Sequence, residues 1–256
     1  MIAATIPRAA LVTGAAQRIG RAIALHLAGL GWAIGVHYRD SAAAAAELVA
    51  AIRAGGGRAA ALQADLGRED EVATLVPRAA AALGPLGCLV NNASTFDYDS
   101  AESATRASWD HHMEANLRAP FVLTQGFAAQ LPDGAEGVVV NLIDQRVWNL
   151  TPHFMTYTVS KAGLWTLTQT LAMALAPRIR VNAVGPGPTL PSRHQDDAQF
   201  ARQCAEMPLR RGTTPDEIAE AVAFILSAPA MTGQMIALDG GQHLGWAQPR
   251  ASAPKD

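Results

Sequence analysis

Short apolar runs alternate along this chain with longer segments in which apolar residues recur every three or four positions. The first run, residues 9–13, leads into a glycine-containing turn and then into a helical pattern that begins at Ile19. Strands that alternate with helices in this way form a parallel sheet with helices on both faces. We predict an α/β fold, a single Rossmann-type, doubly wound, seven-stranded parallel sheet with six helices. The predicted strands are residues 9–13, 32–38, 59–64, 88–90, 137–143, 180–184 and 234–238.

One long segment in the last third of the chain has no clear period. Residues 189–212 are polar and interrupted by prolines, and the segment is longer than most connections in a compact domain. We therefore predict a loop there that covers the substrate. A single domain is predicted for residues 1–246, and a disordered tail for residues 247–256.

Composition narrows the range of partners. The 256 residues carry a formal net charge of −2 without a basic run, which argues against nucleic acid or an anionic membrane as a partner. No apolar stretch reaches the roughly 18 residues of a membrane span, and no signal peptide is evident. The two cysteines, Cys88 and Cys204, form neither a disulfide framework nor a metal-ligand pattern, so we expect no metal site and a cytoplasmic location. The expected partners are small molecules and other copies of the chain.

The main candidates for acid-base chemistry are Tyr157 and Lys161, which stand four positions apart in a predicted helix. On a helix this spacing brings the phenol and the ammonium to the same face. A free tyrosine has a pKa of about 10, and a nearby positive charge lowers it toward the range in which a proton is exchanged at neutral pH. Asp144 lies thirteen residues before Tyr157, at the predicted end of a strand. Taken alone, a Tyr and a Lys at this spacing could equally be ordinary surface residues.

The turn between the first strand and the first helix, from Gly14 to Gly20, suits a dinucleotide cofactor. A helix N-terminus presents backbone N–H groups and a partial positive charge, both of which favour a pyrophosphate. The three-glycine pattern of such turns is incomplete, because Arg18 stands where the middle glycine could be. The alternative is a turn that serves only to pack the helix on the strand.

The end of the second predicted strand selects between NADH and NADPH. In dinucleotide-binding folds a carboxylate here binds the ribose 2′-hydroxyl, whereas an arginine binds a 2′-phosphate. Tyr38 occupies the usual acidic position and Arg39 follows it, which favours NADPH. The alternative is that Arg39 is solvated and that Asp40 is the ribose partner.

Polar residues also follow the third and fourth predicted strands. Asp65 lies where the adenine edge would be met, although an Asp after a strand is as often a helix cap. Residues 91–96 follow a strand, at the position where open parallel sheets bind ligands. Asn116 lies in an otherwise apolar helix predicted to begin at Ser108, so it either bridges backbone and water or belongs to a site.

With these residues in place, the chain resembles the short-chain dehydrogenase/reductase family along nearly its whole length. The matching motifs are T-G-A-A-Q-R-I-G at 13–20, D-L at 65–66, N-N-A at 91–93, Asn116, Y-T-V-S-K at 157–161 and P-G at 186–187. The resemblance implies that Tyr157 is the general acid, that Lys161 lowers its pKa and holds the nicotinamide ribose, and that Asn116 supports a water relay. The cofactor-binding residues expected from the motifs and the strand ends are Gly14, Arg18, Ile19, Gly20, Arg39, Ser41, Asp65, Leu66, Asn92, Ala93, Tyr157, Lys161, Pro186, Gly187 and Thr189.

One position departs from the usual pattern of that family. A serine usually stands thirteen residues before the tyrosine and polarises the substrate carbonyl, but this chain has Asp144. An ionised carboxylate only accepts hydrogen bonds and would repel the oxyanion that forms from a ketone. The exchange resembles the pteridine reductase branch, as do Arg18, H-Y-x-x-S at 37–41 and N-A-S-x-F at 92–96. By that resemblance the pterin is bound by Arg18, Ser94, Phe96, Asp144 and Tyr157, with Phe96 stacked on it; alternatively, Phe96 is a core aromatic.

The leading hypothesis is an NADPH-dependent reductase that transfers a hydride to a C=N bond of a pterin or dihydrofolate, with Tyr157 and Asp144 supplying the proton. The alternative is a short-chain carbonyl reductase that acts on a ketone or a 3-oxoacyl thioester. A nucleotide-binding sensor without activity is a third reading, disfavoured by the intact catalytic residues. The family resemblance also implies a homotetramer, with Trp165 and Trp246 as candidate interface residues.

Overall fold

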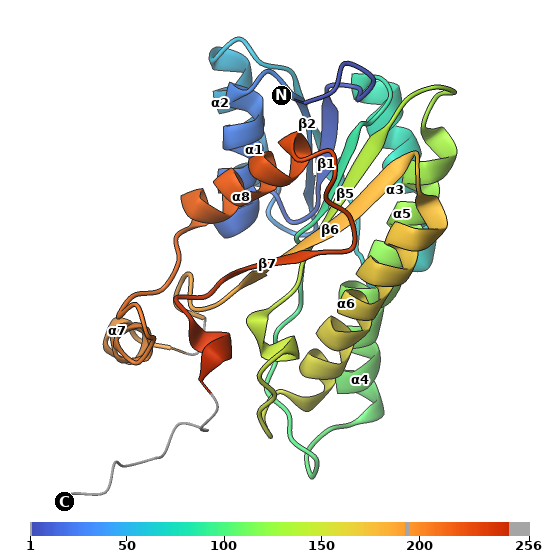
Figure 1. Ribbon diagram of the computed structural model, residues 1–256. Coiled ribbons are helices and arrows are strands. Elements are labelled where there is room, and N and C mark those ends of the chain that lie inside the picture. Colours follow the sequence, from blue (N-terminus) through green and yellow to red (C-terminus); the bar gives the residue numbers. More distant parts are fainter. Residues whose placement is uncertain (1, 193–194, 246–256) are drawn as a thin grey trace, which may run out of the picture.

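The computed structural model describes residues 2–192 and 195–245, and these contain a seven-stranded parallel sheet (Figure 1). The strands are β1 (Ala9–Val12), β2 (Ala33–Tyr38), β3 (Ala59–Gln63), β4 (Cys88–Asn91), β5 (Gly137–Leu142), β6 (Ile179–Pro186) and β7 (Met235–Leu238). Their order is β3-β2-β1-β4-β5-β6-β7, which confirms the predicted doubly wound sheet. Along the sequence, strands β1 to β3 extend the sheet in one direction from its centre, and strands β4 to β7 extend it in the opposite direction. Such a reversal opens a crevice at the carboxyl ends of β1 and β4.

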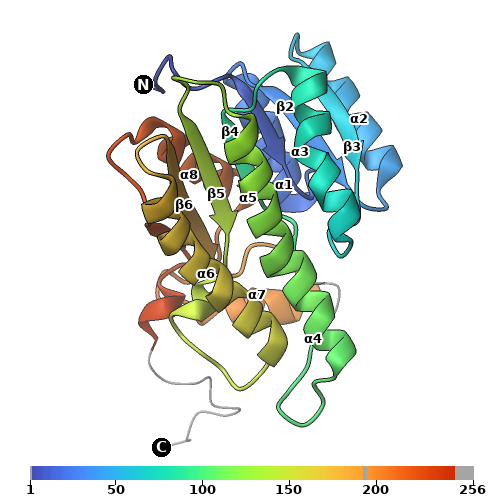
Figure 2. The same ribbon diagram turned by 90° about the vertical axis from the view of Figure 1, so that its right-hand side faces the viewer.

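Helices cover both faces of the sheet (Figures 1 and 2). One face carries α1 (Arg18–Gly29), α2 (Ala42–Ala54) and α8 (Pro215–Ser227). The opposite face carries α3 (Glu69–Leu83), α5 (Ala119–Gln130) and α6 (Met155–Leu175). Because each of these helices follows a strand of a parallel sheet, helix N-termini and strand carboxyl ends share one edge of the molecule.

The central strands β1, β4 and β5 are buried on both sides because successive side chains point to opposite faces and both faces are covered. In β1, Ala10 and Val12 pack in the core with α1, α2 and α8. Ala9 and Leu11 pack in the core with α3, α5 and α6. All four side chains are buried, so the short apolar runs seen in the sequence are strands covered twice.

The prediction of six helices is wrong, and so is that of an irregular loop over residues 189–212. A further helix, α7 (Asp197–Ala205), lies within this segment. The Asp196 side chain accepts the N–H of Gln199 at 2.7 Å, and the Gln199 side chain accepts the N–H of Asp196 at 3.0 Å. No side chain of α7 is buried. The helix is therefore set by its cap rather than by a buried face, and its residues are mostly polar, which is why the segment was predicted to be a loop.

The helix predicted to begin at Ser108 begins earlier and is divided. It comprises α4 (Arg106–Met113), a π-helical turn (Glu114–Arg118) and then α5. The Thr105 side chain accepts the N–H of Ser108 at 3.1 Å, which fixes the start of α4. Pro120 has no N–H for the carbonyl of Asn116 four residues earlier, so the α-helical register cannot be kept there. The interruption therefore falls at a predicted site residue.

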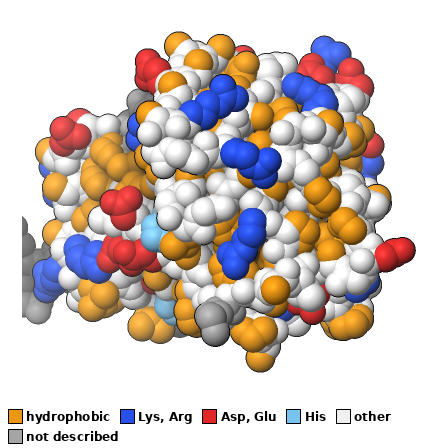
Figure 3. Space-filling view, turned by 90° about the horizontal axis from the view of Figure 1, so that it is seen from above, with side chains coloured by type: hydrophobic (Ala, Val, Ile, Leu, Met, Phe, Trp, Pro, Cys, Tyr) orange, Lys and Arg blue, Asp and Glu red, His pale blue; other side chains and the backbone are white. Residues whose placement is uncertain are grey.

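Arginines close the ends of three helices at the amino-terminal edge of the sheet. Arg58 donates to the last carbonyl of α3, Arg178 to the carbonyl that follows α5, and Arg180 to a carbonyl in the last turn of α8. The final carbonyls of a helix carry a partial negative charge, which a guanidinium offsets. Figure 3 looks onto this end and shows basic side chains standing singly among apolar and uncharged ones. These arginines therefore stabilise the fold on the side away from the crevice.

Two predictions fall outside the described residues, namely the tail at 247–256 and the candidate interface residue Trp246. Trp165 is half-buried, and its ring meets that of Trp148 edge to face at 6.2 Å between centroids. Within residues 2–192 and 195–245, none of the helices has both the length and the apolar character needed to cross a bilayer.

Candidate active site

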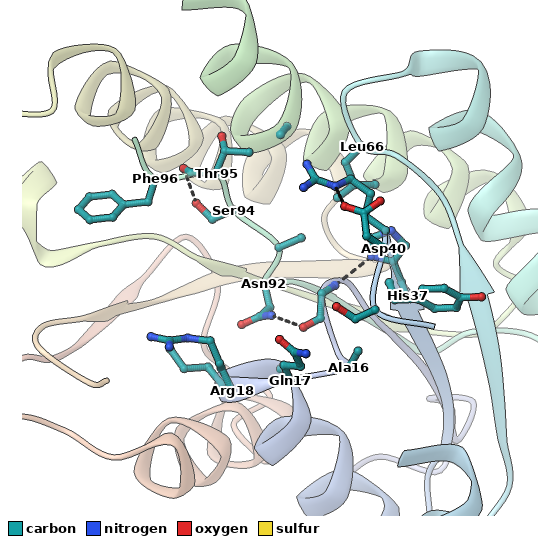
Figure 4. Close-up of a pocket in the computed structure, with 18 of the residues that line it drawn as sticks. Ala16, Gln17, Arg18, His37, Asp40, Leu66, Asn92, Ser94, Thr95 and Phe96 are labelled. Atoms are coloured by element: carbon teal, nitrogen blue, oxygen red, sulfur yellow. Dashed lines mark hydrogen bonds and ion pairs between the residues drawn. The ribbon is translucent and has the colours of Figure 1, made fainter. Parts of the chain in front are cut away.

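A cavity of about 730 Å³ lies in the crevice at the carboxyl edge of the sheet (Figure 4). It runs from the turn before α1, past the end of β2, to the segment that follows β4. In Figure 4, Asp40 and His37 lie toward one end, and Ser94 and Phe96 toward the other. The predicted site residues that line it are Gly14, Arg18, Ile19, Gly20, Arg39, Ser41, Asp65, Leu66, Asn92, Ala93, Ser94 and Phe96.

The turn before α1 requires glycine at two places. Gly14 has φ +62°, a conformation that an L-residue rarely adopts. A Cβ on Gly20 would lie 2.3 Å from the Gly14 carbonyl oxygen and 2.6 Å from the amide nitrogen of Asn92. Asn92 in turn donates to the Thr13 carbonyl at 2.8 Å. The turn, the start of α1 and the end of β4 thus pack against one another without room for a side chain.

Arg18 occupies the position where the middle glycine was missing, and it has a glycine-like φ of +54°. Its guanidinium donates to the carbonyl oxygen of Pro191 at 2.9 Å and to that of Leu190 at 3.4 Å. The left-handed backbone conformation costs an L-residue about 1–3 kcal/mol, and the contacts that Arg18 makes in the folded protein must offset this cost. Arg18 therefore spans the crevice from the glycine turn to the segment after β6.

His37, the fifth residue of β2, is buried beneath the glycine turn. Its Nδ1 accepts the N–H of Gly14 at 2.9 Å, so Nε2 carries the hydrogen and donates to the Ala64 carbonyl at 3.0 Å. Burial lowers the pKa of His37 to about 4, whereas the bond to Ala64 acts to raise it. A single neutral side chain therefore joins the cofactor turn to the end of β3, a role that the apolar pattern of β2 could not predict.

Protonation of His37 is expected to destabilise the protein at acid pH. The folded-state pKa of about 4 lies below the usual value of 6.5, so the unfolded chain binds the proton more tightly. The free energy of unfolding should therefore fall by about 3 kcal/mol as pH decreases from about 6.5 to about 4. Urea titrations at a series of pH values measure this slope. Asn at position 37 keeps an acceptor near the place of Nδ1 and has no titrating ring. The free energy of unfolding of His37→Asn should therefore depend less on pH between about 6.5 and 4. Parallel plots of this free energy against pH for the two proteins would contradict the assignment.

Both candidate ribose partners lie at the end of β2 and line the cavity. The Nε of Arg39 is 2.6 Å from a carboxylate oxygen of Asp40, and both side chains are largely exposed. Such an exposed pair contributes little to stability, so each partner is available to a ligand. Asp65 also lines the cavity, and its side chain accepts the N–H of Gly67 at 2.9 Å, so it forms a turn as well.

Asp144, two residues after β5, and Tyr157, on α6, meet just beyond the Phe96 end of this cavity. The hydroxyl of Tyr157 donates to Oδ2 of Asp144 at 3.0 Å, and the backbone N–H of Arg146 donates to Oδ1 at 2.8 Å. Both carboxylate oxygens therefore act as acceptors. Burial, followed by the charge of Asp144 and the hydrogen bond to it, raises the pKa of Tyr157 well above 10. The expectation that the pKa of Tyr157 is lowered is thus reversed, and the phenol is held protonated.

Lys161 is one turn further along α6 and is buried. Its ammonium donates to the Leu142 carbonyl at 2.8 Å and lies 5.8 Å from the centroid of the Tyr157 ring. Burial lowers the pKa of Lys161 to about 8, while the charge of Asp144 acts to raise it. The lysine therefore anchors α6 to the end of β5, and it is the Asp144 carboxylate that accepts from the phenol hydroxyl.

Asn116 connects the segment after β4 to α6. Its Oδ1 accepts the N–H of Thr95 at 2.8 Å and the hydroxyl of Ser94 at 3.2 Å. Its Nδ2 donates to the Thr95 carbonyl at 3.0 Å and to the Ser160 hydroxyl at 3.1 Å. The side chain is fully buried, so it joins the predicted substrate residue Ser94 to the helix of Tyr157.

Aromatic rings form one wall of the site. Phe96 stacks on Phe154 with 4.4 Å between ring centroids, and the Tyr157 ring meets Phe96 edge-on at 4.7 Å. Phe154 has φ +57° at the start of α6, and the guanidinium carbon of Arg146 lies 5.2 Å from its ring centroid. Phe96 therefore lines the cavity, as a residue that stacks on the substrate would. It also packs against two other aromatic rings, as a core aromatic would.

The predicted cofactor residues after β6 do not line the cavity described above. Gly187 is required by packing, because a Cβ there would lie 2.7 Å from the Cα of Asp239. The Thr189 hydroxyl donates to the Gly187 carbonyl at 3.0 Å, and Pro186 ends β6. These residues directly precede Leu190 and Pro191, whose carbonyl oxygens accept from Arg18. They therefore form the opposite rim of the crevice.

The chain is similar to several known proteins. A family model described as enoyl-(acyl carrier protein) reductase matches residues 14–243. The crystal structure of FolM alternative dihydrofolate reductase 1 from Brucella suis in complex with NADP is 45% identical, with a TM-score of 0.92 over 97% of this chain and 99% of that one. The Brucella canis structure of the same name is 44% identical, with a TM-score of 0.93 over 98% and 100%. A 3-oxoacyl-(acyl-carrier-protein) reductase, FabG, from Staphylococcus epidermidis is 34% identical and covers 93% of this chain and 99% of its own.

Proposed function

Because the chain belongs to the short-chain dehydrogenase/reductase family, we propose that it is an NADPH-dependent reductase of a C=N bond in a pterin or dihydrofolate. Both Brucella relatives bear the name of a dihydrofolate reductase and were crystallised with NADP. The proposal rests on one observation in this chain, the hydrogen bond from Tyr157 to the carboxylate of Asp144.

The residues around the glycine turn fit a dinucleotide with a 2′-phosphate. No acidic side chain lies in the first turn of α1 and Gln17 makes no capping bond, so backbone N–H groups there are open to a pyrophosphate. Gly20 allows close approach, and Arg18 and Arg39 bring positive charge to the cavity. When bound, NADPH supplies the hydride.

Asp144 and Tyr157 suit a nitrogen acceptor better than a ketone. Reduction of a ring C=N bond leaves a basic nitrogen that needs a proton, and the protonated phenol of Tyr157 can donate one. The Asp144 carboxylate accepts hydrogen bonds from amino groups of a pterin, whereas it would repel the oxyanion of a reduced ketone. The raised pKa of Tyr157 keeps the donor loaded across the neutral range.

The test of this function is NADPH oxidation with a panel of substrates. The panel contains 7,8-dihydrobiopterin, dihydrofolate, a small ketone and a 3-oxoacyl thioester, each with and without methotrexate. We expect turnover of a reduced pterin or folate that methotrexate blocks. Turnover of the thioester alone would support the alternative, a carbonyl reductase, which the similarity to FabG favours.

Substitution of Arg39 should separate the two possible ribose partners. Arg39→Ala is expected to raise Kd for NADPH about tenfold or more, because a charge-assisted contact to phosphate is lost, and to change Kd for NADH less than about twofold. Asp40→Ala is the matched control and should leave the preference for NADPH intact. Titration of each nucleotide by fluorescence measures both constants; weaker NADH binding in Asp40→Ala alone would identify Asp40 as the ribose partner instead.

We also propose a homotetramer of one domain per chain in a reducing cytoplasm. The described cysteines, Cys88 and Cys204, are both free thiols. Large apolar side chains are exposed on α6 and α8, among them Met173 and Phe224. Sedimentation of a monomer would contradict the tetramer.

A further inference from the structure

Three buried polar side chains lie behind the aromatic wall and belong to none of the predicted motifs. They are Asp99, His112 and Thr156, each at most 2% exposed. Asp99 belongs to the segment that carries Ser94 and Phe96, His112 belongs to α4, and Thr156 directly precedes Tyr157 on α6. They therefore join the predicted substrate segment to the helix that carries the proton donor.

Asp99 caps α6 from a distant part of the chain. The helix has no side-chain cap of its own, because Phe154 occupies the cap position. The Asp99 carbonyl accepts the N–H of Phe154 at 2.9 Å and that of Met155 at 3.4 Å. One oxygen of the Asp99 carboxylate accepts the N–H of Thr156 at 3.1 Å, and the other accepts the Thr156 hydroxyl. Three successive N–H groups at the start of the helix are thus met by a single residue.

The hydrogen bonds of this cluster have one possible direction. A carboxylate can only accept, so the hydroxyl of Thr156 must donate to Asp99. The Nδ1 of His112, 2.7 Å from that hydroxyl, must then donate to it. The Nε2 of His112 accepts the backbone N–H of Asp97 at 3.1 Å. His112 is therefore neutral with its hydrogen on Nδ1, which agrees with burial lowering its pKa.

We propose that Asp99, Thr156 and His112 are positioning residues that fix the substrate segment, residues 94–99, relative to the hydroxyl of Tyr157. This role rests on the proposed function of that segment in binding the substrate. The His112 ring lies 6.0 Å from the Tyr157 ring between centroids, and Phe96 lies 4.7 Å from it. A displacement of either side would change the distance over which the proton is transferred, and misplacement of about 1 Å costs about 10²-fold in rate.

Thr156→Val tests the proposal because it keeps the shape of the side chain and removes the hydroxyl. We expect kcat/KM for the substrate to fall by about tenfold to a hundredfold, while Kd for NADPH stays within about twofold. Thr156→Ser restores the hydroxyl and should recover most of the activity. Thr166→Val is the control, because Thr166 is exposed on the same helix and, among the residues that the structure describes, its hydroxyl bonds to the Ala162 carbonyl alone. Wild-type kcat/KM in Thr156→Val would overturn the role.

A second variant covers the case in which Thr156→Val does not fold. Asn at position 112 has a donor near the place of Nδ1 but cannot reach the N–H of Asp97. His112→Asn should therefore loosen the substrate segment and raise KM for the substrate by more than it lowers kcat. Equal effects on both constants, or none, would contradict a positioning role.

The hydrogen position on His112 can be tested without turnover. Nitrogen-15 NMR of histidine-labelled protein should show a neutral ring with the hydrogen on Nδ1 whose signal is missing in His112→Asn. A hydrogen on Nε2 of His112 would overturn the network. If the wild type reduces a ketone and no pterin, the proposed function fails, and the Thr156 and His112 comparisons are made with that ketone.

Discussion

Tyr157→Phe is expected to lower kcat for the reduced pterin by about 10³-fold, within the range of about 10²–10⁴ that a positioned general acid contributes. The exchange removes only the hydroxyl that donates to Asp144 at 3.0 Å. The ring and its edge-on contact with Phe96 remain, so KM for the substrate should change little. Stopped-flow measurement of NADPH oxidation at saturating substrate determines the loss.

The control for this variant is Tyr98→Phe. Tyr98 belongs to the substrate segment, but the exchange keeps its ring and the contact of that ring with Phe154, and removes a hydroxyl whose one contact among the described residues is 3.5 Å to His153. The two exchanges are chemically identical, so a difference between them isolates the Tyr157 hydroxyl. Tyr157→Phe with more than about a tenth of wild-type kcat would mean that another group donates the proton.

Asp144→Asn is expected to lower kcat/KM for the pterin by about 10²-fold, because the shape is kept while the charge and one acceptor are lost. The wild-type carboxylate accepts from Tyr157 on one oxygen and from the N–H of Arg146 on the other. An asparagine has a single oxygen, so it cannot serve both donors. Loss of the negative charge should also lower the pKa of Tyr157 and that of Lys161, both of which Asp144 raises. The alkaline limb of the pH-rate profile should therefore move to lower pH.

Asp144→Ser makes the complementary change. A serine hydroxyl can donate to a carbonyl oxygen, so we expect turnover of a small ketone to rise about tenfold while pterin turnover falls. The same substrate panel measures both activities. Unchanged pterin turnover in Asp144→Ser and Asp144→Asn would remove the carboxylate from the mechanism, and the chain would then be a general carbonyl reductase.

The sequence predicted the sheet and most of the cavity because both follow from local patterns and one topological rule. Apolar runs mark the strands, and the carboxyl ends of parallel strands share an edge, so Gly14, Arg39 and Asn92 had to converge. The helix α7 was missed because its Asp196 cap, and no apolar face, defines it. The division near Asn116 was missed because one proline sets it within an otherwise regular pattern.

The chemistry of the site was harder to predict, because it depends on distances between segments far apart in sequence. Burial raises the pKa of Tyr157 first, and the Asp144 carboxylate that accepts from the phenol raises it further, while the Lys161 ammonium is occupied by the Leu142 carbonyl. The role of His37, which entered only as part of the motif at 37–41, and His112 altogether were missed for the same reason. A histidine inside an apolar strand or a short helix gives no sign of the backbone N–H groups that it accepts across the fold.

The cap that Asp99 supplies to α6 also bears on the order in which the chain folds. A helix with a local cap can complete its first turn early, but the partner of Thr156 lies 57 positions away, across two α-helices and a strand. Closure of so long a loop costs chain entropy that is recovered only after the intervening elements have packed. The first turn of α6 is therefore completed only when the segment that carries Asp99 has packed beside it, so the placement of the proton donor depends on tertiary contacts and not on the helix alone.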